Sequence, residues 1–173
     1  MRLTLRYALV GLIALVAFGA YFSTQSHQVS YQDAKIQVGS KSVTLVIDYG
    51  KTSNRSIDVF DLSQVPDKAT GWQVMKQARV QIQGTDQYPT GFACRINWWP
   101  SAKAQDCHNT PSATQGHWAY FVTHSQLGEG WILSGQGAAS HIPDCGGYEG
   151  WAWIEPNKQT TPPRYKASVR GCK

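Results

Sequence analysis

The residues best suited to chemistry in this sequence are aromatic side chains and cysteines, and they gather in one stretch. Six of the seven tryptophans and three of the four cysteines lie between Gly91 and Trp153. Trp98 and Trp99 form an adjacent pair before Pro100, at the expected tip of a hairpin. Because successive residues of a strand point to opposite sides, the two indoles cannot both face a core. We therefore expect at least one of them to be exposed and to contact a ligand or a partner.

A second group of candidate ligand-binding residues begins at Trp131. A link rich in glycine and alanine runs from Ser134 to Ala138. Its backbone amides are potential donors, and strand-end loops of a small sheet can converge on one edge beside the indole faces. The candidate ligand-binding set therefore comprises Trp98, Trp99, Trp131, Ser134, Gly135 and Gln136.

The sequence lacks the residue patterns of an enzyme. Ser134 stands between Leu133 and Gly135 rather than in a G-x-S-x-G turn, so it is not an activated nucleophile. The segment 135–139 lacks the lysine and the following helix of a phosphate-binding loop. The carboxylates of the region show no paired spacing for acid–base catalysis: Asp106, Glu129, Asp144, Glu149 and Glu155. We therefore expect a protein that is not an enzyme.

The four cysteines indicate an oxidising compartment. Their number is even, and all of them lie beyond the apolar N-terminal segment. Three pairings are possible. Cys94 with Cys107 closes a short loop and leaves Cys145 with Cys172, a bond that ties the C-terminal tail to the domain. We predict this pairing.

A zinc site is the alternative use of these cysteines, because four histidines lie in the same region. None of the histidines or cysteines shows a C-x-x-C or H-x-x-x-H spacing: His108, His117, His124 and His141. We therefore expect no metal site.

The N-terminal residues predict export. Arg2 and Arg6 precede residues 7–22, an apolar run without a charge. With the uncharged residues that follow, the run approaches the roughly 20 residues that span a bilayer. We expect residues 1–26 to be a signal anchor or a signal peptide that is cleaved. The rest of the chain is then expected on the extracytoplasmic side of the cell membrane, single pass if anchored and secreted if cleaved.

The bulk composition is that of one globular domain with an appendage. The chain has 173 residues, of which 42% are hydrophobic and 16% are charged. The formal net charge is +5, and the basic residues beyond the N-terminus are scattered. Scattered basic residues do not make the patch or stripe that a nucleic acid requires, so we expect no nucleic-acid partner.

Local patterns predict a mixed α+β domain. Residues 43–50 and 56–62 are expected to pair as an antiparallel hairpin. A short amphipathic helix is expected to begin after Thr70 as its N-cap and to bury Trp72 and Met75. Four further strands are expected at 92–96, 117–123, 131–133 and 151–154, with a possible short strand at 80–83. Trp118 and Trp153 are expected in the core.

Five sequence blocks follow one another in order along the chain: VTLVIDYG, ATGWQVMKQA, GFACRIN, HWAYFVTH and GQGAASHIP…GYEGWAWIEP. They resemble the transcobalamin-like C-terminal domain family, and the cysteine-bearing form is similar to a branch of exported actinobacterial proteins. The resemblance covers residues 43–155. It implies a β-grasp (ubiquitin-like) roll with one helix, and in the vitamin B12 carriers this domain closes over one face of the corrinoid. Residues 27–42 are then a linker, and 156–173 a tail tied back by the disulfide.

Two hypotheses of function follow. The first is an exported, membrane-anchored module that binds a small flat ligand, a corrinoid or a similar cofactor, or assists its uptake beside a transporter component. No cofactor is required for the fold itself. The second is a structural or protein-interaction module of the cell envelope.

Overall fold

The computed structural model describes residues 39–112, 114–124 and 130–172. The predicted membrane segment 7–22 lies outside these residues. Among the residues that are described, no helix has the length and apolar character needed to cross a membrane. Residues 38–173 form one compact unit, and its described part contains one short helix packed on a sheet.

The main sheet has five strands in the order β2-β1-β7-β5-β6. The strands are β1 (Ser40–Asp48), β2 (Asp58–Pro66), β5 (His117–Val122), β6 (Ile132–Leu133) and β7 (Gly147–Ile154). β1 and β7 lie side by side in the centre and run parallel, whereas the other pairs are antiparallel. The sheet is thus mixed, and the α+β class predicted from the sequence is confirmed.

The first hairpin forms as the alternating pattern predicted, with longer strands. β1 pairs with β2 at seven positions, from Ser40 opposite Pro66 to Ile47 opposite Asp58. β1 begins at Ser40, inside the stretch predicted as a linker. The register shifts at a bulge between Lys41 and Val43, and the two strands pair again beyond it. β2 therefore ends at Pro66 rather than Leu62.

The helix α2 (Gly71–Gln77) begins where the capping signal indicated. The hydroxyl of Thr70 accepts from the amide of Gln73, and the side chain of Gln73 accepts from the amide of Thr70. This reciprocal capping box satisfies two backbone donors that the first helical turn leaves open. Trp72 and Met75 are buried, as predicted. α2 ends at Gln77, and two residues later the exposed Arg79 has a φ of 57°, outside the helical region.

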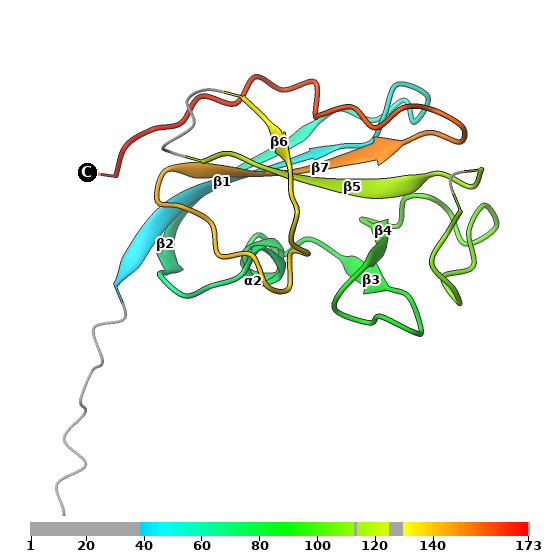
Figure 1. Ribbon diagram of the computed structural model, residues 1–173, viewed down its shortest axis with the longest axis horizontal. Coiled ribbons are helices and arrows are strands. Elements are labelled where there is room, and N and C mark those ends of the chain that lie inside the picture. Colours follow the sequence, from blue (N-terminus) through cyan, green and yellow to red (C-terminus); the bar gives the residue numbers. More distant parts are fainter. Residues whose placement is uncertain (1–38, 113, 125–129, 173) are drawn as a thin grey trace, which may run out of the picture. The chain divides into compact units, whose positions relative to one another are not determined.

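The main core lies between α2 and one face of the sheet (Figure 1). Four aromatic side chains from β5 and β7 share this face, and Trp118 stands opposite Trp153 in the register. The rings of these two tryptophans meet edge to face with centroids 5.7 Å apart. The prediction that Trp118 and Trp153 are core residues is confirmed.

The opposite face of the sheet is covered by the C-terminal tail. Figure 1 shows the tail running along the side of the sheet away from α2. Ala167 of the tail is buried with Val46 and Tyr148, and Tyr165 packs against the same cluster. The tail is therefore part of the packed unit.

A second, two-stranded sheet is formed by β3 (Ile82–Gly84) and β4 (Ala93–Ile96), which pair antiparallel. It lies on the α2 side of the main sheet in Figure 1. Ile96 belongs to the main core, and Ile82 packs against it. The short strand considered at 80–83 and the strand at 92–96 are both present, each shifted by one or two residues.

The last strand differs from its prediction. β7 begins at Gly147, four residues before the expected start, so residues 147–150 also belong to the strand. β7 is buried along its whole length because β1 and β5 flank it and both of its faces are covered. Its third residue is Glu149, and its side chain is therefore carried into the interior.

Candidate functional site

The two tryptophans of the predicted aromatic tip lie in different environments. Trp98 is 70% exposed, so the expectation that at least one of the pair faces solvent is confirmed. Trp99 packs against the main core, with its ring 6.5 Å from that of Trp153 in an edge-to-face contact. The carbonyl of Trp99 accepts a hydrogen bond from Nε1 of Trp118 at 3.1 Å. Trp99 thus contributes to the packing of the core, whereas Trp98 faces solvent.

The other sequence candidates are not assembled around Trp98. Trp131 packs on the tail side of the sheet, where its Nε1 donates to the carbonyl of Tyr165 at 2.7 Å. Ser134 donates its amide to the carbonyl of Tyr120, and its hydroxyl donates to the carbonyl of Gln136. Gly135 has open space around the position of an added Cβ. None of these residues lines the small hollow beside Trp98.

A cluster of buried ionisable groups lies near the start of α2. Glu149 is 1% exposed, and the hydroxyl of Tyr120 donates to its Oε2. Nε2 of His141 lies 3.3 Å from Oε1 of Glu149, close enough for an ion pair but without the angles of a hydrogen bond. Lys41 is also buried, and its Nζ donates to the carbonyls of Asp67 and Pro143 at 2.8 and 2.5 Å.

Burial shifts the titration of this cluster. It raises the pKa of Glu149, and the contacts with His141, Tyr120 and Lys41 offset only part of that effect. The pKa of Tyr120 is raised by the same burial and by the neighbouring carboxylate. Burial lowers the pKa of Lys41, against the attraction of Asp67 and Glu149. Neither of the two pockets described below is lined by these residues, and all three are buried, so the cluster is an internal polar network.

A pocket of about 320 Å³ opens between the tail and the ends of β1 and β7. We call it the tail pocket. Its walls are partly apolar, from Trp153, Ile154 and Pro162, and it carries the side chains of Lys51 and Lys158. Its volume is at the lower end of the range of small-molecule sites.

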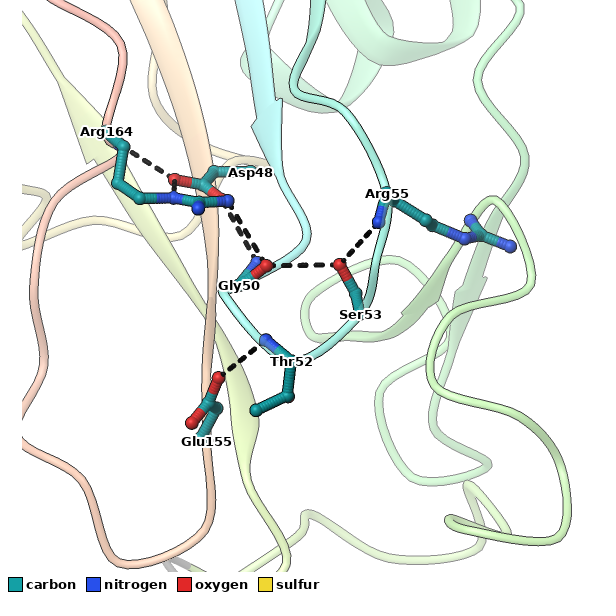
Figure 2. A network of polar contacts seen from close by, with 7 residues as sticks. All are labelled: Asp48, Gly50, Thr52, Ser53, Arg55, Glu155 and Arg164. Carbon is teal, nitrogen blue, oxygen red and sulfur yellow. Dashed lines mark hydrogen bonds and ion pairs between the residues drawn. The ribbon is translucent and has the colours of Figure 1, made fainter.

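An ion pair fixes the wall of the tail pocket that the tail supplies (Figure 2). Nη2 and Nε of Arg164 donate to the carboxylate of Asp48 at 2.6 and 2.9 Å, and the amide of Arg164 donates to it at 2.8 Å. Asp48 is buried, which by itself would raise its pKa. The hydrogen bonds from Arg164 and the amide of Gly50 outweigh burial and hold the pKa below its usual value.

The loop after β1 completes the pocket. Gly50 has a φ of 81°, a conformation that favours glycine, and an added Cβ would lie 3.1 Å from Cδ1 of Trp153. The hydroxyl of Ser53 donates to the carbonyl of Gly50, and the amide of Thr52 donates to Glu155 at 3.2 Å. Figure 2 shows that these contacts connect the loop to the end of β7. The loop is therefore held in one conformation.

Both predicted disulfides are present. Cys94 bonds to Cys107, and Cys145 bonds to Cys172, with Cα atoms 5.7 and 5.6 Å apart. The second bond anchors the end of the tail beside the start of β7. Within the described ranges, no group of three or more histidine, cysteine or acidic side chains is placed to hold a metal ion.

Sequence reasoning missed Asp48, Arg164 and Glu149. Asp48 and Arg164 are 116 residues apart, and neither stands in a motif. A signal for Glu149 did exist, since Glu149, Trp151 and Trp153 alternate along one face once the strand is extended backwards.

No family model matches the sequence, and comparison with curated proteins and with solved structures likewise gives no match.

Proposed function

We propose that residues 38–173 are an exported, membrane-anchored binding module that is not an enzyme, and that its small-molecule site is the tail pocket. The observation that carries this proposal is a concave site of about 320 Å³ whose walls are fixed by the Asp48–Arg164 ion pair. Preformed walls favour binding, because little conformational entropy is lost when a ligand enters.

The strand order supports assignment of the fold to the β-grasp class. In that fold two hairpins flank a central pair of parallel strands, the first and the last, and a helix packs on one face. Here β1 and β7 are the parallel pair, β2 and β5 flank them, and α2 covers one face. β3 and β4 are an addition between α2 and β5.

The lining of the tail pocket favours a small ring compound with an anionic group. Lys51, Lys158 and Arg164 supply three positive charges, against two negative charges from Asp48 and Glu155. Asp48 is engaged with Arg164, so the two lysines are the groups available to an anion. A corrinoid or a similar cofactor is larger than the tail pocket, so only an edge of it would enter. A smaller aromatic carboxylate fits inside.

The proposal of a module without catalysis rests on the same lining. The tail pocket contains the hydroxyl of Thr161 but no histidine to activate it, and the buried Glu149 cluster is not part of its walls. Export and anchoring rest on the predicted segment 7–22 and agree with two disulfides, which persist in oxidising compartments. We include in this proposal that the module assists uptake of its ligand beside a transporter component.

Calorimetric titration of the full-length chain in detergent tests the site. The probes are a corrinoid, a flavin mononucleotide, haem and a small aromatic carboxylate such as salicylate. We expect at least one probe to bind, and Lys51→Ala with Lys158→Ala to weaken an anionic probe at least tenfold. Two charge-assisted contacts of about 1 kcal/mol each account for that loss.

The matched control is Lys76→Ala with Lys103→Ala, which removes two exposed lysines outside the pocket. This variant should bind as the wild type does. The proposal is wrong if no probe binds, or if both double variants retain the affinity of the wild type.

The second candidate function, a structural or protein-interaction module of the envelope, is favoured by the edge of the main sheet. β6 is an edge strand, and its Ile132 and Leu133 are 37% and 55% exposed. An exposed apolar edge can pair with a strand of another chain. Leu133→Lys should then abolish any complex that crosslinking of the wild-type chain detects in the envelope.

A further inference from the structure

The exposed Trp98 occupies a backbone position that disfavours it. Ile96 and Trp99 exchange two backbone hydrogen bonds of 2.9 Å around a two-residue loop, Asn97–Trp98. The φ angles of these two residues are 47° and 65°, both positive, as a type I′ turn requires. Glycine is the preferred second residue of such a turn, and a bulky side chain is a rare occupant.

The core does not account for Trp98 at this position. Its side chain is 70% exposed, the highest value among the exposed large hydrophobic residues of the described part of the chain. Burial therefore compensates little of the unfavourable backbone conformation. Residues kept in such conformations concentrate at functional sites, where the surrounding structure holds them.

The turn that carries Trp98 is held firmly. The side chain of Asn97 accepts from the amide of Gln81 at 3.0 Å and donates to the hydroxyl of Tyr49 at 2.7 Å. The amide of Asn97 donates to the carbonyl of Gln81, and Arg55 donates to the carbonyl of Asn97. The indole is thus presented from a rigid support.

Beside the indole lies a shallow hollow of about 40 Å³, lined by Trp98 with Gln81, Ile82, Gln83 and Arg95. Gln81 and Gln83 are alternate residues of one extended segment and are both exposed. Arg95 donates to Oε1 of Gln83 and to the carbonyls of Pro100 and Gln105. The Gln83 amide is therefore oriented by a buried cation, with its NH₂ donors left for another acceptor.

We propose that Trp98, Gln81 and Gln83 form a surface subsite for one sugar unit of a neutral glycan chain. The apolar C–H face of a pyranose stacks on an indole, and planar side-chain amides pair with neighbouring hydroxyls. The hollow is too small to enclose a molecule, so its ligand extends across the surface, as a polymer does. The Arg95 cation is engaged with protein acceptors, which favours a neutral sugar over an anionic one. This site is separate from the tail pocket and does not depend on it.

Depletion of the full-length chain from solution by insoluble glycans tests the proposal. The probes are three neutral insoluble glycans: cellulose, chitin and curdlan. The detergent is lauryldimethylamine oxide, which has no sugar group. The wild type should bind at least one of them. Trp98→Gly should reduce that binding at least tenfold, while its melting temperature stays unchanged or rises by about 2–4 °C as the turn relaxes. Gln83→Leu should also weaken binding.

Tyr88→Ala is the matched control, because Tyr88 is another exposed aromatic residue, 47% exposed, that does not line the hollow. It should bind the glycan as the wild type does. Absence of binding to all three glycans overturns the proposal, and so does full binding by Trp98→Gly. A fall of more than about 4 °C in the melting temperature of Trp98→Gly assigns Trp98 to the fold instead.

Discussion

Arg164 of the tail and Asp48 at the end of β1 form an ion pair across 116 residues, with Nη2 2.6 Å from Oδ1. The carboxylate is 4% exposed and the guanidinium side chain is 41% exposed, so the charge on Asp48 is the one removed from water. A buried carboxylate is stable only with its partner in place. The pair therefore links the conformation of the tail to that of the central strands.

Replacing Asp48 with asparagine should destabilise the fold by about 1.5–3 kcal/mol at pH 7, the range for hydrogen bonds to charged groups. Because the pKa of Asp48 is lowered in the folded state, its contribution is present above the pKa of an unfolded aspartate. It is lost as the pH falls through the lower folded value. Urea unfolding of wild type and Asp48→Asn should thus converge in acid.

Asp86→Asn is the control for this prediction, because Asp86 and His108 form an ion pair in which both side chains are at least 70% exposed. Exposed pairs contribute little, so the variant should unfold almost as the wild type does. Equal unfolding of Asp48→Asn and wild type at pH 7 would contradict the assignment of the tail contact.

Glu149 should give the opposite pH dependence. Its folded pKa is raised, so the folded state binds the proton more tightly than the unfolded state. Stability is then greatest below the unfolded pKa of a glutamate and falls as the pH rises through the raised folded value. Glu149→Gln keeps an acceptor for Tyr120 and removes the charge, so this part of the pH dependence should disappear.

The measurement is urea unfolding of wild type and Glu149→Gln between pH 4 and 8. Their free energies of unfolding should differ increasingly toward pH 8, with the variant the more stable. The groups around the carboxylate are Tyr120 on β5, His141 on the preceding loop and Lys41 on β1. Glu155→Gln, which changes a half-buried carboxylate just after β7, should leave the wild-type profile intact. Parallel profiles of wild type and Glu149→Gln would show that the carboxylate stays charged in the fold.

The parts of the fold that were predictable depend on neighbours in the sequence. The N-cap at Thr70 and the burial of Trp72 follow from one helical turn. The short-loop disulfide, Cys94–Cys107, follows from a separation of 13 residues. Such features are determined largely by local geometry, and local patterns report them correctly.

The parts that were not predictable depend on contacts between distant segments. Only the packing of Trp99 on Trp153 decides which of the two adjacent tryptophans faces the core. The tail pocket requires Arg164 to reach Asp48, a contact with no local signal. Glu149 lies before the strand predicted at 151–154, and its partners Tyr120 and His141 come from other segments, so no local pattern indicates its burial. Tertiary contacts override local preference at these positions.

Trp99→Ala should destabilise the fold by about 3 kcal/mol. Loss of a tryptophan from a core costs roughly 3–5 kcal/mol, and Trp99 is only partly buried, so the lower part of that range applies. The change removes the edge contact with Trp153. Urea unfolding at pH 7 measures this loss of stability.

Trp98→Ala is the control, because Trp98 is the neighbour of Trp99 on the same turn. It should change the free energy of unfolding by less than about 1 kcal/mol. Similar losses in both variants would contradict the different environments of the two side chains.

Removing the disulfide of the tail should loosen the tail without releasing it completely. In Cys145→Ser with Cys172→Ser, the unfolded chain regains the freedom of a loop of 27 residues, which costs about 3–4 kcal/mol of stability in the chain-entropy model. The ion pair of Arg164 remains. Residues beyond it keep the hydrogen bond from Arg170 to Gly146 but lose their covalent anchor. Trypsin should therefore cut after Lys166 and Arg170 faster than in the wild type, while cleavage between Gly39 and Arg164 keeps its wild-type rate. Mass spectrometry of the reduced digest identifies the sites.

Cys94→Ser with Cys107→Ser should lose similar stability but keep the wild-type cleavage rate in the tail. Equal cleavage rates in all three proteins would mean that the packing of Ala167 and Tyr165 holds the tail without the bond.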